Sequence, residues 1–323
     1  MIDIVMNPEN IEDFYLECLN RCFGDWGGTA MYRWCFERRL GGRKPDIMLL
    51  RKEGAVLGGS AVTYRHAMLN DVMVRIAVMT GSWTLPEARN QGCFTMMVDE
   101  SLSLAKKAGA ALLMAFVTEK NPSTRRLIER GCATFPSHYL VSPLDGRDIT
   151  PPVPFSVTQD STRCSLDVSL LMTAGGAGCA RFVYSPDEWR SQFIDRTEIV
   201  EFACIEDTCV GVIEKKGIFD RLLAFRGYAD HSREDVLKAC CAKALNNRRR
   251  LFFFTTSSSL KDYAVEIGFE RIPGYITALI AHEGALKTVF RECPDGKITP
   301  VDLYDPGSPR YIGEWDLTAG DRM

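Results

Sequence analysis

Two uninterrupted apolar runs constrain the fold of this chain more than any other feature of its sequence. The first is ALLMAFV at residues 111–117, and the second is LFFF at residues 251–254. A strand that is apolar at every position is typical of a sheet with both faces covered by helices. Each run precedes a capping residue and a helical stretch that ends at a glycine. The sequence therefore predicts an α/β fold built from mixed sheets.

The elements around the two apolar runs follow the same order in each half of the chain. Asn121 lies ten residues before Gly131, and Ser258 lies ten residues before Gly268. We interpret this order as an internal duplication. Two unrelated α/β domains with the same spacing are the alternative.

The length suits two domains, since a domain takes about 150 residues and the chain has 323. Four prolines between residues 143 and 154 indicate a linker. We expect one domain at 1–145, a linker at 146–158, and a second domain with a tail at 159–323.

The overall charge gives no indication of a strongly charged partner such as nucleic acid. Lys and Arg number 39 against 42 Asp and Glu, which gives a net charge of −3. This balance does not favour a broad nucleic-acid surface. No run approaches the roughly 20 apolar residues of a membrane helix, and the first ten residues lack the pattern of a signal peptide. We expect a cytoplasmic protein without a nucleic-acid or membrane partner.

The cysteines do not form a recognisable metal or redox motif. The chain has 12 cysteines and 4 histidines, and no two cysteines have the C-x-x-C spacing. We expect buried, free thiols in a reducing compartment and no metal site. A metal or disulfide framework is the alternative.

The two halves differ most before their central helix. Gly58 and Gly92 are 34 residues apart, whereas Gly211 lies only 21 residues before Ser232. The first half uses the extra length for SWTLPEARNQGCFTMM, which predicts a strand, a loop and a helix. Free backbone N–H groups and the helix dipole at such a helix start bind phosphate groups. The sequence predicts an anion-binding loop in the first half alone.

Residues 55–135 resemble the GNAT superfamily of acyl-CoA-dependent N-acyltransferases. The hallmark loop of that family, Q/R-x-x-G-x-G/A, stands here as Arg89-Asn90-Gln91-Gly92-Cys93-Phe94. Phe94 departs from the small residue of the family pattern. The second half resembles a degenerate GNAT copy without this loop. The resemblance implies tandem GNAT-like folds.

The resemblance also implies a co-substrate, acetyl-CoA or another acyl-CoA. The amides of Gln91 to Thr95 would hold its pyrophosphate, and the backbone from Trp83 to Leu85 would pair with the pantetheine arm. Asn121 and the turn after it would meet the cysteamine end. The implied binding residues are Trp83, Thr84, Leu85, Arg89, Asn90, Gln91, Gly92, Cys93, Phe94, Thr95, Asn121 and Ser123.

Direct transfer to an amine needs a base for the ammonium and a proton for the leaving thiolate. Glu119, which follows the first apolar run, is our candidate base, with a solvated strand-end charge as the alternative. Family members often carry a tyrosine acid where this chain has Ile128. Tyr139, next to His138, is our second candidate catalytic residue. Cys93 at a helix start is a further candidate nucleophile.

The resemblance implies an N-acyltransferase that acts on a small amine. One alternative is an aminoacyl transferase of the tandem type that uses charged tRNA, which the acidic balance disfavours. The other is a non-catalytic CoA-binding regulatory module, which Phe94 and the missing tyrosine suggest.

Overall fold

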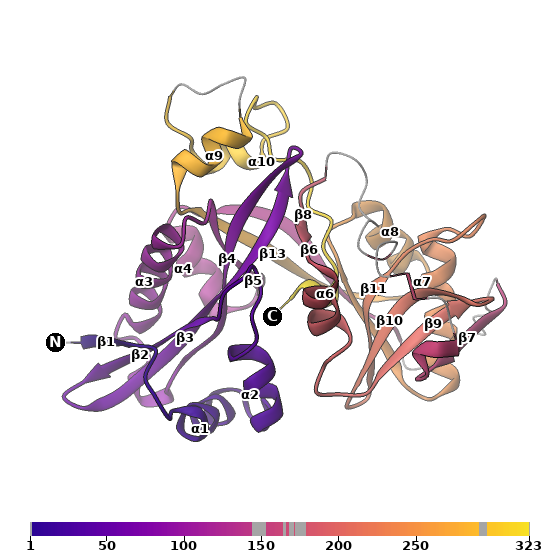
Figure 1. The fold of residues 1–323 in the computed structure, drawn as a ribbon, viewed down its shortest axis with the longest axis horizontal. Coiled ribbons are helices and arrows are strands. Elements are labelled where there is room, and N and C mark those ends of the chain that lie inside the picture. Colours follow the sequence, from indigo (N-terminus) through magenta and orange to yellow (C-terminus); the bar gives the residue numbers. More distant parts are fainter. Residues whose placement is uncertain are drawn as a thin grey trace. The chain divides into compact units, whose positions relative to one another are not determined.

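The computed structural model describes residues 2–143, 153–163, 166–167, 171, 179–290 and 296–322. Its contacts divide the chain into two compact units (Figure 1). Unit 1 comprises Met1–Phe135 and Ile276–Gly313, and unit 2 comprises Pro136–Tyr275 and Glu314–Arg322. Each unit is therefore built from two separate pieces of the chain.

Unit 1 is a sheet with helices packed on it. The sheet order is β1-β2-β3-β4-β5 followed by the end of β13. β1 to β4 pair in antiparallel fashion, and β4 and β5 pair in parallel. Its elements are β1 (Ile2–Met6), α1 (Glu12–Phe23), α2 (Thr29–Phe36), β2 (Asp46–Lys52), β3 (Ala55–Leu69), β4 (Val72–Thr84), η1 (Pro86–Ala88), α3 (Cys93–Lys107), β5 (Leu112–Thr118), α4 (Pro122–Glu129), α9 (Glu283–Val289) and α10 (Pro300–Tyr304).

The first apolar run forms β5, a strand in the interior of this sheet, as predicted. Leu112, Leu113 and Met114 are all buried. The next position of the sheet belongs to β13 (Glu270–Ile280), whose Thr277 hydroxyl donates to the carbonyl of Ala115 at 3.3 Å. Helix α3 packs against β2, β3, β4 and β5, which explains why the run has no polar positions.

Unit 2 repeats this plan. Its sheet order is the start of β13, then β6-β12-β11-β10-β9-β7, and β11 and β12 form the parallel pair. Its elements are β6 (Ala133–Val141, from Pro136 on), β7 (Phe155–Thr158), η2 (Ser161–Arg163), β8 (Arg181–Val183), α6 (Pro186–Phe193), β9 (Val200–Ile205), β10 (Thr208–Lys216), β11 (Phe219–Phe225), α7 (Arg233–Asn246), β12 (Arg250–Thr255), α8 (Ser258–Glu266) and η3 (Ala319–Asp321).

The strand registers match the two units to each other. Gly58 on β3 pairs with Thr84 near the end of β4, and Gly211 on β10 pairs with Phe225 at the end of β11. Strands β3, β4 and β5 thus correspond to β10, β11 and β12, in line with an internal duplication. The N-cap of α8 is Ser257, one residue earlier than the sequence spacing indicated.

The predicted linker at 146–158 lies only partly within the described residues. Residues 146–152 are outside them, and Phe155–Thr158 form β7, which pairs with β9. Proline content alone does not reveal that Phe155 and Val157 pack against the core of unit 2. The boundaries at 145 and 159 stay a prediction.

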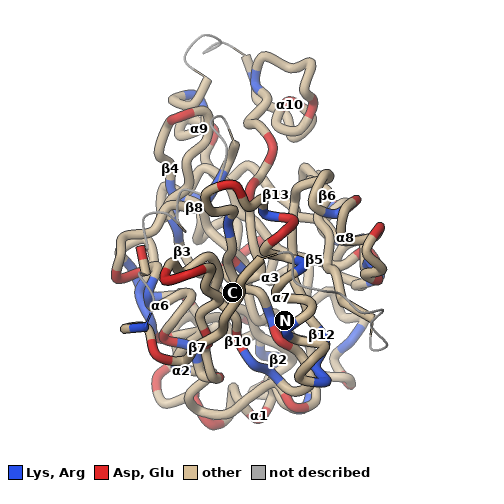
Figure 2. Tube along the Cα trace, turned by 90° about the vertical axis from the view of Figure 1, so that its right-hand side faces the viewer, with Lys and Arg blue, Asp and Glu red and all other residues tan. Residues whose placement is uncertain are grey.

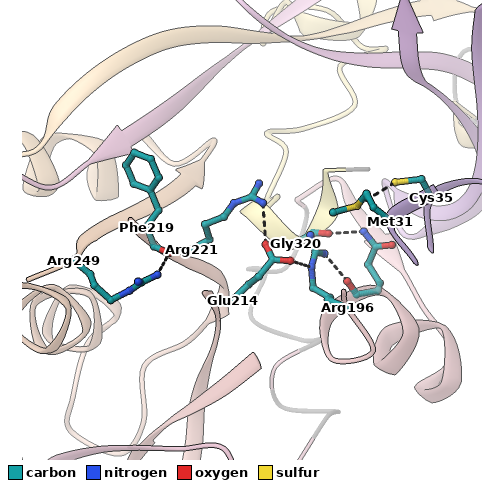
Figure 3. Close-up of polar contacts among 9 residues, drawn as sticks. Met31, Cys35, Arg196, Glu214, Phe219, Arg221, Arg249 and Gly320 are labelled. Carbon is teal, nitrogen blue, oxygen red and sulfur yellow. Dashed lines mark hydrogen bonds and ion pairs between the residues drawn. The ribbon is translucent and has the colours of Figure 1, made fainter. Parts of the chain in front are cut away.

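A buried ion-pair cluster in unit 2 joins three elements (Figure 3). Glu214 on β10 accepts from Arg196 after α6 at 2.6 Å and from Arg221 on β11 at 2.9 Å. The Glu214 and Arg196 side chains are 1% and 4% exposed. Elsewhere, basic and acidic residues are interspersed along the chain (Figure 2).

Candidate functional site

The parallel strands β4 and β5 diverge beyond a short paired stretch. Their registered pairs run from Ile76–Leu112 to Val78–Met114. Beyond Val78, β4 continues to Thr84 and β5 to Thr118 without further pairing to each other. The facing edges of the two strands are therefore open to an extended ligand, which can hydrogen-bond to a strand edge as an added strand.

A β-bulge in β4 lies within this divergent part. The register between β3 and β4 shifts between Gly59 and Ala61. Opposite the shift, Gly81 has a φ of 57°, and a Cβ there would lie 2.9 Å from the ring of Phe36. A bulge bends its strand and increases its twist. The bend in β4 therefore coincides with its separation from β5.

The predicted pantetheine-binding residues extend β4 beyond this bulge. The Leu85 N–H donates to the Leu57 carbonyl at 2.9 Å, so it points toward β3. Because the backbone groups of neighbouring strand residues point to opposite sides, those of Thr84 point away from β3. Trp83 is 2% exposed. The Thr84 N–H therefore faces away from β3, whereas the Thr84 carbonyl accepts from the Cys22 thiol at 3.5 Å and the Leu85 N–H is engaged with β3.

The predicted pyrophosphate loop leads into the start of α3. Gly92 is the N-cap residue with a φ of 78°, and the first turn has no side-chain cap and no acidic residue. The N–H groups of Phe94 and Thr95 have no hydrogen-bond partner among the described residues, and that of Cys93 contacts its own thiol. A helix start of this kind has free donors and a positive dipole end, which together suit an anion.

The corresponding helix start in unit 2 is closed. Ser232 caps α7, with its hydroxyl accepting from the Asp235 N–H at 3.2 Å. The Asp235 carboxylate in turn accepts from the Ser232 N–H at 2.9 Å, and Glu234 adds a second acid to the first turn. The first turn of α7 therefore carries two acidic residues and a capping box, whereas that of α3 has neither. That only the first copy binds an anion stays a prediction.

The side chains of the predicted pyrophosphate loop in unit 1 differ in their exposure to solvent. Arg89, Asn90 and Gln91 are exposed, and the Gln91 amide donates to the carbonyl of Glu87 at 3.3 Å. Phe94 is partly buried.

Cys93 lacks the properties of a nucleophile. Its side chain is buried, and its thiol donates to the Ala88 carbonyl at 3.7 Å. Burial raises the pKa of the Cys93 thiol, despite the favourable position at a helix start. The thiolate hypothesis for Cys93 is therefore disfavoured.

The end of β5 presents Glu119 and Asn121. Asn121 caps α4, and its carbonyl oxygen accepts from the N–H of Ser123 at 3.0 Å and from the Ser123 hydroxyl at 2.8 Å. The side-chain oxygen of Asn121 therefore stabilises the turn, while its NH₂ group has no partner among the described residues. Glu119 is exposed, and its carboxylate makes no ion pair or hydrogen bond within the described chain. These residues belong to the same unit as the loop.

Tyr139, in contrast, belongs to unit 2. It is buried there, with its ring centroid 5.1 Å from that of Phe254 and 4.3 Å from the guanidinium carbon of Arg322. Burial raises the pKa of Tyr139. Burial also lowers the pKa of its neighbour His138 to about 4, with Arg271 adding to the effect. The structure therefore groups Glu119 with the loop but places Tyr139 in an aromatic cluster of the other unit.

Sequence reasoning missed the contribution of α1 to this site. Arg21 forms an ion pair with Glu87 of η1 at 3.1 Å, and the Cys22 thiol donates to the Thr84 carbonyl at 3.5 Å. It also missed a pair of hydroxyls at the bulge, where Ser60 and Ser82 lie 2.7 Å apart. These contacts join residues more than 20 positions apart, so no local sequence signal reveals them.

Three further observations concern membrane spans, metal ligands and cysteines. Among the described helices, none is long and apolar enough to cross a membrane. Within the same residues, no group of three or more His, Cys, Asp and Glu side chains is placed to hold a metal ion. The described cysteines are free thiols.

Comparison with known proteins agrees with this geometry. A family model described as an acetyltransferase (GNAT) domain matches residues 6–126. No curated protein sequence matches the chain.

Solved structures resemble the chain along most of its length. A tandem GNAT protein from the clavulanic acid biosynthesis pathway has a TM-score of 0.58 at 14% identity, with 87% of this chain and 99% of that chain covered. GCN5-related N-acetyltransferases from Anabaena variabilis and Kribbella flavida have the same TM-score of 0.58 and the same 14% identity. The match covers 88% and 90% of this chain, respectively, and 74% of each of theirs. At this identity the likeness shows the fold.

Proposed function

We propose that this chain is an acyl-CoA-dependent N-acyltransferase, because residues 6–126 match the family model of a GNAT acetyltransferase domain and the chain resembles a tandem GNAT protein in fold. The acyl donor is acetyl-CoA or a close analogue, and the acceptor is a small amine. Unit 1 holds the donor, and the chain needs no metal ion for this reaction.

The observation that carries this proposal is the difference between the two helix starts. At α3, the first turn has no side-chain cap and no acidic residue, whereas at α7 the Ser232–Asp235 pair engages the N–H groups of both its members and Glu234 adds a second acid. The free amides lie after the divergent end of β4, so a ligand with both an anionic group and an extended arm fits this site. Coenzyme A has a pyrophosphate and a pantetheine arm, which match these two features.

The chemistry assigned to the site is direct attack of a neutral amine on the thioester, in which the C–N bond forms and the C–S bond breaks. CoA leaves as a thiolate, which takes the proton that the attacking nitrogen loses, directly or through water. Glu119 takes the proton from the ammonium, directly or through water, because its carboxylate is unpaired at the end of β5. Thr84 and the other open backbone groups of β4 hold the pantetheine arm so that the thioester lies in the strand opening. Holding both reactants in one geometry supplies a large part of the rate enhancement in such transfers.

Calorimetry with CoA and acetyl-CoA tests the proposal, with Gly92→Glu as the disrupting variant. The new carboxylate would lie at the anion position and repel the pyrophosphate. Gly109→Glu, just after the other end of α3, is the matched control. Gly109 has a φ of 69° and Gly92 a φ of 78°, and at neither position does an added Cβ have another atom within 4 Å. We expect CoA binding to be lost in Gly92→Glu and kept in Gly109→Glu. Absence of binding to the natural chain at millimolar CoA refutes the proposal.

A further inference from the structure

The divergence of β4 and β5 recurs in unit 2 between β11 and β12. Registered pairs of these strands run from Phe219–Arg250 to Leu222–Phe253, and β12 then continues to Thr255. In unit 1 the corresponding opening is the proposed pantetheine groove. In unit 2 it contains part of the chain itself, residues 314–322, which we call segment 314–322. The part of this segment in η3 contacts both β11 and β12.

Segment 314–322 meets the open edge of β12 through one backbone bridge and one side chain. Thr318 forms an antiparallel bridge with Thr255, whose other side pairs with His138 of β6. Thr318 therefore takes the side of β12 that β11 has left. The Thr256 hydroxyl donates to the Trp315 carbonyl and accepts from the Leu317 N–H at 3.3 Å. The segment thus lies where an extended ligand would be added to the edge of β12.

The fit of this segment is close. Leu317 and Ala319 are each 1% exposed. A Cβ on Gly320 would lie 2.1 Å from the Phe193 ring and 2.9 Å from the Leu223 carbonyl oxygen. The Gln192 amide donates to the Gly320 carbonyl at 2.5 Å. Glycine is therefore required at this position for the segment to remain in place.

Two charged residues fix the far end of the segment. The Asp321 carboxylate accepts from the Tyr184 hydroxyl at 3.0 Å and from the Thr318 N–H at 2.7 Å. The guanidinium of Arg322 lies over the ring of Tyr139, with its carbon 4.3 Å from the centroid. The groove therefore recognises side chains as well as backbone.

We propose that the β11–β12 opening is a peptide-binding groove and that its ligand is segment 314–322. Both units of the duplicated scaffold have the strand opening. In unit 2 the capping of α7 removes the phosphate site, and segment 314–322 fills the space beside β12. The groove itself is inferred without reference to CoA. If the segment fills the opening in unit 2, the chain binds a single CoA, in unit 1. This consequence rests on the proposed function.

A pair of glycine variants tests this inference. In Gly320→Ala the added methyl cannot be accommodated, so the segment must leave the groove. Gly28→Ala is the matched control, because Gly28 has a φ of −106° and no atom within 4 Å of an added Cβ. The probe is a fluorescent peptide with the sequence EWDLTAGDR, which is that of residues 314–322, and its binding is followed by anisotropy.

We expect the peptide to bind Gly320→Ala at least about tenfold more tightly than the natural chain or Gly28→Ala, a difference of about 1.4 kcal/mol. A peptide with alanine at the glycine position should not bind. Equal binding to all three proteins, or no binding to Gly320→Ala, overturns the inference.

Hydrogen exchange of Thr256→Val provides a second test if Gly320→Ala does not fold. Loss of both hydrogen bonds of the Thr256 hydroxyl weakens the segment. The Leu317 amide should exchange at least about tenfold faster, while amides of β10 keep their rates. Unchanged exchange at Leu317 overturns the inference.

Calorimetry on the same variants separates the two proposals. One CoA per chain, both in the natural protein and in Gly320→Ala, supports both proposals. Two CoA molecules bound to Gly320→Ala would show that the groove takes CoA and would overturn the peptide assignment. Peptide binding to Gly320→Ala without any CoA binding would refute the proposed function alone.

Discussion

The Glu214 carboxylate lies 2.6 Å from the Nε of Arg196, and both side chains are almost fully buried. Arg221, whose side chain is 22% exposed, pairs with the other carboxylate oxygen at 2.9 Å. One carboxylate thus compensates two guanidinium groups in unit 2. The cluster links β10, β11 and the turn after α6, so its integrity affects the strand that borders the peptide groove.

Glu214→Gln should strongly destabilise unit 2. The substitution leaves the two arginines without a counter-charge, and breaking a buried pair costs about 3–5 kcal/mol. The free energy of unfolding in urea measures the effect. Glu201→Gln is the control. Glu201 pairs with Lys215 at 3.1 Å, and the Lys215 and Glu201 side chains are 23% and 14% exposed. Ion pairs closer to the surface contribute about 1 kcal/mol or less to stability. Equal losses in the two variants would contradict this account.

Glu119→Gln should lower kcat while leaving CoA binding intact. General-base catalysis contributes about 10²- to 10⁴-fold, and the glutamine cannot take the proton. Steady-state kinetics with an amine that the natural protein acetylates, together with CoA calorimetry, give the two readouts. Glu53→Gln, an exposed residue in the β2–β3 turn, serves as the control. An undiminished kcat in Glu119→Gln would remove this residue from the mechanism.

Cys93→Ala should retain transfer activity. Burial raises the pKa of this thiol, so little thiolate forms near neutral pH, and the proposed attack does not pass through an acyl-cysteine. Alanine also fits this small buried site. We expect kcat to stay within about threefold of the natural value, which corresponds to a rise in activation free energy well below 1.4 kcal/mol. Loss of activity with retained CoA binding would instead indicate a covalent route.

His138 should make the stability of the protein depend on pH. Its pKa is lowered to about 4 in the folded chain, against about 6.5 in an unfolded chain. The unfolded chain therefore binds a proton in this range that the folded chain does not. The contribution is complete above pH 6.5 and is lost as the pH falls toward 4, with a slope of at most about 1.4 kcal/mol per pH unit.

Urea unfolding between pH 7 and 4 measures this slope. His138→Gln removes the titrating group, so the variant should lose less stability than the natural chain when the pH falls through this range. Identical pH profiles of the two proteins would show that other groups cause the change.

Local patterns predicted several elements correctly because the forces that form them act over a few residues. The apolar run from Leu112 is a buried strand, Asn121 caps the next helix, and Gly92 precedes an uncapped helix start. The length difference between the two copies falls where their structures differ, at the uncapped start of α3 and the capped start of α7. The roles of Glu119 and the loop residues in catalysis and binding stay predictions.

Other features had no local signal. Helix α2 ends at Phe36, and the chain then turns through a bridge between Leu40 and Arg43. The contact of Cys22 with Thr84 spans 62 residues. Side-chain contacts of this range depend on how whole strands and helices pack, which periodicity does not encode.

The sequence by itself determined the α/β character, the duplicated order of elements and the glycine-containing loop before α3. Capping, strand burial and glycine conformation decide these features within short stretches. Only the tertiary structure decided that Ile276–Gly313 belongs with the first unit and that Tyr139 belongs with the second. It also decided that segment 314–322 occupies the β11–β12 opening. Strand partners distant in sequence are selected by the total burial and hydrogen bonding that each pairing achieves, and only the complete fold defines those quantities.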